Sequence, residues 1–264
     1  MSHRGVCRRN RVLLFILSFL MTVCSGPLLA QSDFLKESEK RAREVLEKSI
    51  QAMGGEAYLK TQDSQRMGRF YQFRKDQLKG STHFQLYQKF PAKTRLEMGK
   101  KSEEVVINDG EQGWKIEYKV VKVQSSQEIE NYKINLTHNL DYILRFRLNE
   151  PGMRIRYIGK SRLDNTEIEG VQLIDKDNDK VKIYVNTATS LPFKMEYRSP
   201  GVGIFDPTDD ETIFYNYHTV QGIQIPYSTV RFSNGFKASE YQLESIQVDM
   251  SLPDALFTPD YIKK

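Results

Sequence analysis

The sequence predicts a mainly β protein: an incomplete, half-open antiparallel β-barrel of about 10–12 strands, wrapped around or covered by two or three helices. Three observations support this prediction. After Lys60 the apolar residues recur with a period of two for most of the chain, as in strands with one buried face. Segments rich in Gly, Asn and Asp separate these runs, as in antiparallel meanders. Strong helical periodicity occurs in only two places, so a parallel sheet with alternating helices is not expected.

Residues 1–30 have the features of a secretory signal peptide. Four arginines and no acidic residue precede or flank an apolar run over residues 12–24, and a small residue follows at Ala30. The run has the length of a signal-peptide core and is shorter than the roughly 20 apolar residues of a membrane span. We therefore expect cleavage after Ala30 and export of a single domain, residues 31–264. An uncleaved anchor is the alternative.

The composition of residues 31–264 excludes several classes of protein. Without the four arginines of the signal, 39 basic residues become 35, against 34 acidic residues, so nucleic acid is not an expected partner. Both cysteines, Cys7 and Cys24, lie in the signal segment. The exported domain is therefore expected to fold without disulfides, and it has no thiol nucleophile and no thiolate metal site.

The first element of this domain is a predicted helix over residues 34–53. Gly54-Gly55 is expected to end it. Its apolar residues recur at helical spacing, so one face should pack on an apolar surface. These residues are Ala42, Val45, Leu46, Ile50 and Met53.

The strands follow, and a helical insertion at about residues 125–148 interrupts them once. Ser125 and Glu128 have the spacing of a capping box, which predicts the start of a helix. Pro151-Gly152 returns the chain to strands. The insertion therefore separates two halves of a meander.

The alternation along the strands predicts an apolar concavity. A long sheet curls under its own twist, and two short helical segments cannot cover its apolar face completely. We therefore predict a lipid-binding cavity with the helical insertion as its lid. Its candidate residues are Phe84, Leu86, Phe90, Trp114, Ile116, Tyr118, Ile183, Phe193 and Met195 from the strands, and Leu140, Ile143 and Leu144 from the insertion. A bulge or a register error of one residue would invert the strand assignments.

Several segments resemble proteins of the LolA type. VVINDGEQGWKIEY is similar to the strand, Asp-Gly turn and Trp-containing strand of that family. FQLYQKFPAKTRLEM, VKIYVNTATSLPFKMEY and LPDALFTPD resemble further family segments and occur in the same order. The resemblance implies a periplasmic carrier that holds the acyl chains of a lipoprotein or lipid and shuttles them toward the outer membrane. It also implies transient protein partners in the inner and outer membranes.

One position departs from the family. LolA proper has an arginine directly before the turn proline, where it is implicated in latching the lid, and this chain has Phe90 before Pro91. Lys89 lies one residue away, so its side chain points to the other face of the strand. The resemblance therefore leaves open whether this lid has a latch.

The sequence offers no sign of enzymatic chemistry. No nucleophile–base pair, phosphate-binding loop or metal-ligand spacing is visible, so we expect no catalytic residue, no metal and no cofactor. The main alternative to a carrier is a LolA-like sensory or protein-interaction module of the cell envelope with no transport role.

Overall fold

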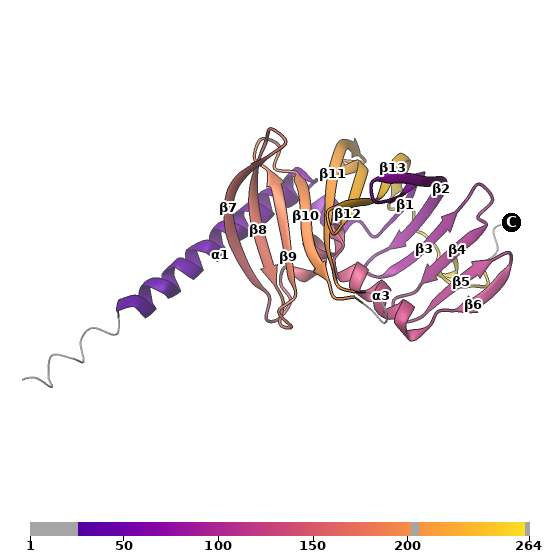
Figure 1. Cartoon of the computed structure of the whole chain (residues 1–264), viewed down its shortest axis with the longest axis horizontal. Coiled ribbons are helices and arrows are strands. Elements are labelled where there is room, and N and C mark those ends of the chain that lie inside the picture. Colours follow the sequence, from indigo (N-terminus) through magenta and orange to yellow (C-terminus); the bar gives the residue numbers. More distant parts are fainter. Residues whose placement is uncertain (1–25, 202–205, 262–264) are drawn as a thin grey trace, which may run out of the picture.

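The computed structural model describes residues 26–201 and 206–261 (Figure 1). Most of the predicted signal peptide, residues 1–25, lies outside the described residues. Among the described helices, none is long and apolar enough to cross a membrane.

The described residues form one 13-stranded antiparallel sheet, which is not closed into a barrel. The predicted half-open antiparallel architecture is confirmed, with one strand more than the expected range. The sheet order is β6-β5-β4-β3-β2-β1-β13-β12-β11-β10-β9-β8-β7. The strands are β1 (Asp63–Arg74), β2 (Gln77–Lys89), β3 (Lys93–Met98), β4 (Glu104–Asn108), β5 (Gly113–Glu117), β6 (Val120–Val123), β7 (Arg154–Leu163), β8 (Thr166–Ile174), β9 (Lys180–Asn186), β10 (Pro192–Ser199), β11 (Thr208–Val220), β12 (Ile223–Ser233) and β13 (Phe236–Val248).

Two meanders make up this sheet, and their first and last strands join them. β1 to β6 form one half and β7 to β13 form the other, and β1 pairs with β13 in the middle. The edges are therefore β6 and β7, which are consecutive strands in the chain. The helical insertion connects them, so it must pass from one edge of the curled sheet to the other. It consists of α3 (Ser126–Thr137), α4 (Leu140–Tyr142) and the π-helical turn η1 (Ile143–Arg147).

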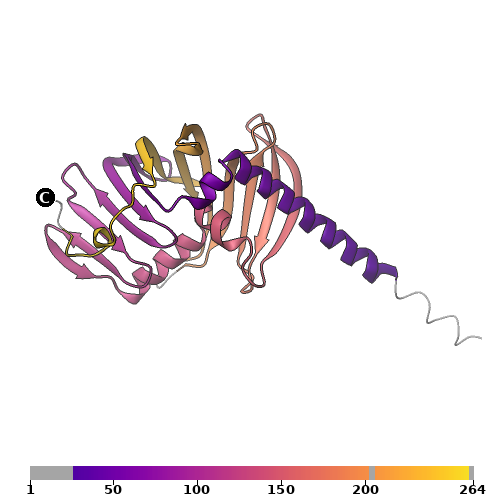
Figure 2. The same cartoon turned by 180° about the vertical axis from the view of Figure 1, so that it is seen from behind.

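The helix α1 (Gly26–Ala52) covers the half of the sheet that contains β7 to β9 (Figure 2). It begins at Gly26, eight residues before the predicted start at residue 34. Pro27 is compatible with this start, since it falls in the first turn, where a helix tolerates proline. Its apolar stripe is buried in the main core together with Leu140, Ile143 and Leu144 of the insertion. Gly54 and Gly55 end the helix as predicted, with positive φ angles of 123° and 57°. The short helix α2 (Glu56–Lys60) follows.

A second core lies in the other half of the sheet, under the C-terminal segment. Leu252, Leu256 and Phe257 of this segment, which includes the 3-10 turn η2 (Asp254–Phe257), pack against Tyr87 and Ile107. Trp114 packs at the border of this core. The turn before Trp114 is held by the Asp109 carboxylate, which accepts hydrogen bonds from the backbone N–H groups of Glu111 and Gln112. The Asp-Gly turn therefore sets the register that brings Trp114 opposite Ile107.

Candidate functional site

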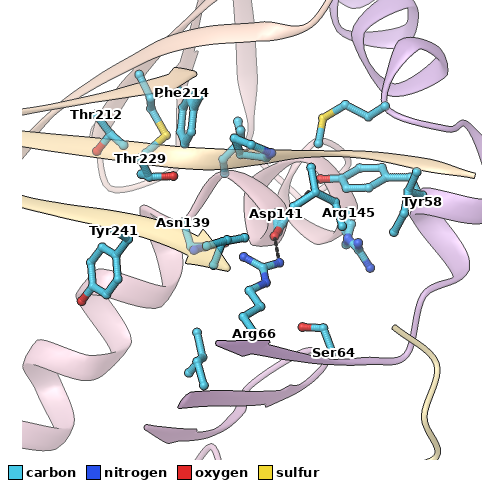
Figure 3. A pocket seen from close by; sticks show the side chains of 18 of the residues that line it. Tyr58, Ser64, Arg66, Asn139, Asp141, Arg145, Thr212, Phe214, Thr229 and Tyr241 are labelled. Carbon is cyan, nitrogen blue, oxygen red and sulfur yellow. Dashed lines mark hydrogen bonds and ion pairs between the residues drawn. The ribbon is translucent and has the colours of Figure 1, made fainter. Parts of the chain in front are cut away.

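A cavity of about 440 Å³ lies where the helical insertion meets both halves of the sheet (Figure 3). Its apolar wall comes from strands that are distant in sequence. The apolar side chains on this wall are Met53, Phe84, Leu86, Phe90, Leu140, Met195, Phe214, Ile223, Ile225, Leu243 and Val248. The β1–β13 pairing makes this possible, because it places β2 and β10 to β13 in one continuous surface.

One side of the cavity is polar, and Asp141 of α4 is at its centre. The Asp141 carboxylate accepts a hydrogen bond from Arg66 Nη2 of β1 at 2.9 Å and one from Tyr58 Oη of α2 at 3.0 Å. Burial works to raise the pKa of Asp141, but the charges of Arg66 and Arg145 and these hydrogen bonds outweigh it and hold the pKa below its usual range. Asp141 is therefore ionised at neutral pH and ties the insertion to the sheet.

Arg145 of η1 makes a second connection between the insertion and the rest of the fold. Its Nη1 donates to the backbone oxygen of Thr61 at 2.9 Å. Its guanidinium carbon lies 4.3 Å from the ring centroid of Tyr58 and 4.2 Å from that of Phe90. Such a cation over aromatic faces is attracted by the ring quadrupoles. Arg145 of the insertion therefore contacts both Tyr58 and Phe90 at the edge of the cavity.

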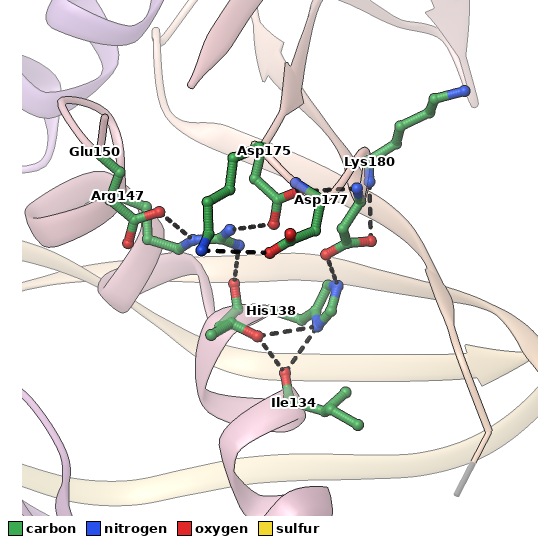
Figure 4. A network of polar contacts seen from close by, with 10 residues as sticks. Ile134, His138, Arg147, Glu150, Asp175, Asp177 and Lys180 are labelled. Atoms are coloured by element: carbon green, nitrogen blue, oxygen red, sulfur yellow. Dashed lines mark hydrogen bonds and ion pairs between the residues drawn. The ribbon is translucent and has the colours of Figure 1, made fainter. Parts of the chain in front are cut away.

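The same insertion is held to the turn between β8 and β9 by a second polar network (Figure 4). Arg147 Nη2 donates to Asp175 Oδ2 at 2.9 Å, and its Nη1 donates to the backbone oxygen of Thr137 at 2.8 Å. His138 Nε2 lies 2.8 Å from Asp179 Oδ2, and its ring stacks on Tyr197 with centroids 4.3 Å apart. Burial tends to raise the pKa of Asp179, but the contact with His138 outweighs it and lowers that pKa. Ion pairs therefore hold the insertion to both halves of the sheet.

Five of the twelve predicted cavity residues line the cavity. They are Phe84, Leu86, Phe90, Leu140 and Met195. Three more are buried in the main core but do not line the cavity: Ile143, Leu144 and Ile183.

The other four do not line the cavity, and for Trp114 and Ile116 the strand register explains why. Residues paired across an antiparallel sheet share a face. Trp114 pairs with Ile107, Ile107 with Arg95 and Arg95 with Tyr87, so Trp114 lies on the face opposite to Leu86. Ile116 has the same parity as Trp114 and also packs at the second core.

Tyr118 and Phe193 depart from the prediction for local reasons. Tyr118 is 90% exposed, with a positive φ of 50°, in the turn between β5 and β6. The register of β10 shifts between Pro192 and Lys194, and this irregularity turns Phe193 toward Tyr215, with ring centroids 6.1 Å apart. A bulge therefore breaks the predicted parity at this point.

The sequence analysis did not predict the polar side of the cavity. Arg66, Asp141 and Arg145 had no place in the apolar pattern that was used to choose candidates. A signal was present, because Asp141 and Arg145 flank the buried Ile143 and Leu144 within one helical turn. Charged residues among buried apolar neighbours need partners, and this points to an ion pair across the cavity.

Comparison with known proteins yields matches among solved structures alone, since neither a family model nor a curated protein matches the chain. A LolA superfamily protein from Nitrosomonas europaea has 16% identity, covers 84% of this chain and 99% of its own, and has a TM-score of 0.56. A putative outer membrane lipoprotein-sorting protein domain from Vibrio parahaemolyticus has 12% identity, covers 84% and 97%, and has a TM-score of 0.55. A DUF1329 family protein from Desulfovibrio piger has 12% identity, covers 82% and 97%, and has a TM-score of 0.57. The fold suggested by the sequence segments is thus that of these structures.

Proposed function

Since the chain has a LolA-like fold, we propose that it is an exported periplasmic carrier of acyl-chain ligands. It binds the chains of a lipoprotein or lipid in the cavity under the helical insertion and shuttles them toward the outer membrane. The observation that supports this most directly is the cavity of about 440 Å³, whose apolar wall is built from both halves of the sheet. This volume falls in the range of about 300–1,000 Å³ that is usual for small-molecule sites.

The energetics of an acyl chain explain why such a cavity is useful. Burial of one methylene group is worth about 0.8 kcal/mol, so a chain of about 16 carbons costs roughly 13 kcal/mol to expose to water. A membrane releases such a chain very slowly. A carrier lowers this cost by offering Phe84, Leu86 and Phe214 as an apolar surface during transit. The proposal requires binding and release, and no chemical step.

The test is native mass spectrometry of the protein purified from a periplasm, with solvent extraction of whatever is bound. We expect a lipid or acylated peptide on the wild-type protein and its loss in Leu86→Glu, which puts a charge on the cavity wall. Leu78→Glu is the matched control, because Leu78 lies on the same strand β2 but is 57% exposed outside the cavity. An empty wild-type protein that also fails to bind a fluorescent fatty acid would contradict the proposal.

A protein-interaction module is the second candidate, and the edge strand β6 favours it. Val120, Val121 and Val123 are exposed by 56, 48 and 73% on this edge. An exposed edge with apolar side chains can pair with an added strand from another protein. In that case the wild-type protein should carry no lipid and should co-purify with an envelope protein. Val121→Lys should then abolish this co-purification. A Val121→Lys variant that keeps its partners would exclude β6 as the interaction site.

A further inference from the structure

The polar side of the cavity contains hydrogen-bonding atoms without partners. Ser64 Oγ, Arg66 Nε and Arg145 Nε are buried, and none of them forms a hydrogen bond within the described part of the protein. All three residues line the cavity, and Figure 3 shows them around Asp141. The Ser64 side chain is fully enclosed, since the residue is 1% exposed. A buried polar group without a partner is unfavourable, so three of them at one wall need an explanation.

The charge at this wall is also unbalanced. Arg66 forms an ion pair with Asp141, whereas no carboxylate of the described residues lies within ion-pair distance of Arg145. The third arginine of the cavity, Arg231, is already paired with Asp210 at 2.6 Å. Asp141 therefore has to compensate both Arg66 and Arg145, and one positive charge remains beside an apolar surface. Buried charges are stable only when they are paired, so this wall favours an anion.

The donors at this wall also suit anionic oxygens. A guanidinium N–H and a hydroxyl both donate to carboxylate or phosphate oxygens, and bonds to charged acceptors are roughly twice as strong as neutral ones. Apolar side chains adjoin the donors: Phe84 and Leu86 lie on β2, the strand paired with β1, which carries Ser64 and Arg66. One cavity thus combines a cationic end with an apolar wall.

We propose that the cavity selects amphiphiles with an anionic head group, a carboxylate or a phosphate, which is bound at Ser64, Arg66 and Arg145 while the chain lies against Phe84 and Leu86. This inference rests on the proposed function and names the ligand class. It also accounts for Arg145, because the head group supplies the second negative charge that Asp141 alone cannot provide.

The test compares ligands of equal chain length on delipidated wild-type protein. Dodecanoate and dodecanol differ only in the head group, and inorganic phosphate supplies the anion without a chain. Hydrogen bonds to a charged group are worth about 1.5–3 kcal/mol, so calorimetry should show dodecanoate binding at least about tenfold more tightly than dodecanol. Phosphate alone should bind much more weakly than dodecanoate.

Two variants and a control locate the preference. Arg66→Met and Arg145→Met should lose the preference for dodecanoate, measured within each variant as the ratio of its affinities for dodecanoate and dodecanol. If Arg66→Met fails to fold, Arg145→Met still tests the selectivity for anions, because the Arg145 substitution breaks no ion pair of the described residues. Arg69→Met is the control on the same strand, since Arg69 is 45% exposed and contacts Glu244 outside the cavity.

The outcomes separate the two proposals. Equal affinity of the wild type for dodecanoate and dodecanol overturns the selectivity for anions and leaves the carrier intact. No binding of either ligand contradicts the carrier itself. If phosphate binds as tightly as dodecanoate, the proposal that the ligand is an amphiphile is refuted, because the site would then bind a free anion.

Discussion

Replacement of Asp141 by asparagine tests how the helical insertion is held on the cavity. The carboxylate bonds both Arg66 and Tyr58, and the side chains of Asp141 and Arg66 are only 16% and 23% exposed. Breaking a fully buried ion pair costs about 3–5 kcal/mol. The partial exposure and the amide oxygen, which still accepts one hydrogen bond, reduce this, so we expect Asp141→Asn to lower the free energy of unfolding by about 1–3 kcal/mol.

The assay has a global and a local part. Urea unfolding measures the total loss, and hydrogen exchange locates it, with faster exchange in residues 126–147 than in α1. Asp177→Asn is the control, because the Asp177 carboxylate is 75% exposed and its one ion-pair contact among the described residues is with Lys176 at 3.9 Å. The folded pKa of Asp141 is depressed, so its contribution is present above the unfolded pKa of about 3.9 and is lost as the pH falls through the folded value. A variant as stable as the wild type within about 0.5 kcal/mol would refute this account of the insertion.

Three further predictions concern other elements of the fold. The Glu128 side chain closes a capping box with Ser125, and a hydrogen bond from Lys115 together with the bonds from Ser125 lowers its pKa to about 2. This stabilisation of α3 is present above about pH 4.5 and should be lost as the pH falls toward about 2, while Ser125→Ala should cost about 0.5–2 kcal/mol by urea unfolding. Phe257→Ala should cost about 3–5 kcal/mol, since Phe257 is 1% exposed in the second core; a loss below 1 kcal/mol would show that the C-terminal segment does not hold this half of the sheet. Gly68→Ala should lower the melting temperature, because its new Cβ would lie 2.0 Å from the backbone oxygen of Gln242 in β13; an unchanged melting temperature would mean that the β1–β13 bulge is dispensable.

Local chemistry made part of this fold predictable. The capping box at Ser125 and Glu128, the glycines that end α1 and the Asp-Gly turn before Trp114 are short-range features, and the structure has all three. The helical insertion between two meanders also followed from a change of period. These features depend on residues within a few positions of one another, which a sequence displays directly.

Long-range pairing decided what the sequence pattern missed. The β1–β13 pairing joins residues near the two ends of the chain, and no local pattern specifies it. It makes the sheet continuous, so that β2 and β10 to β13 share the cavity surface. The registers of β2 to β5 then place Trp114 on the face opposite to Leu86, although both belong to apolar stripes. The irregularity at β10 then turned Phe193 outward. The ion pair of Arg66 with Asp141 joins a strand to the insertion 75 residues later, and alternation of apolar residues carries no information about it.

The most direct test of the proposed carrier is photolabelling with a fatty acid that carries a diazirine in the middle of its chain. The account predicts crosslinks to Phe84, Leu86 or Met195 of the cavity wall, found by peptide mass spectrometry, and their loss with excess unlabelled fatty acid. Labels confined to the exposed valines of β6 or to Trp114 at the second core would contradict it, because the acyl chain would then bind outside the cavity.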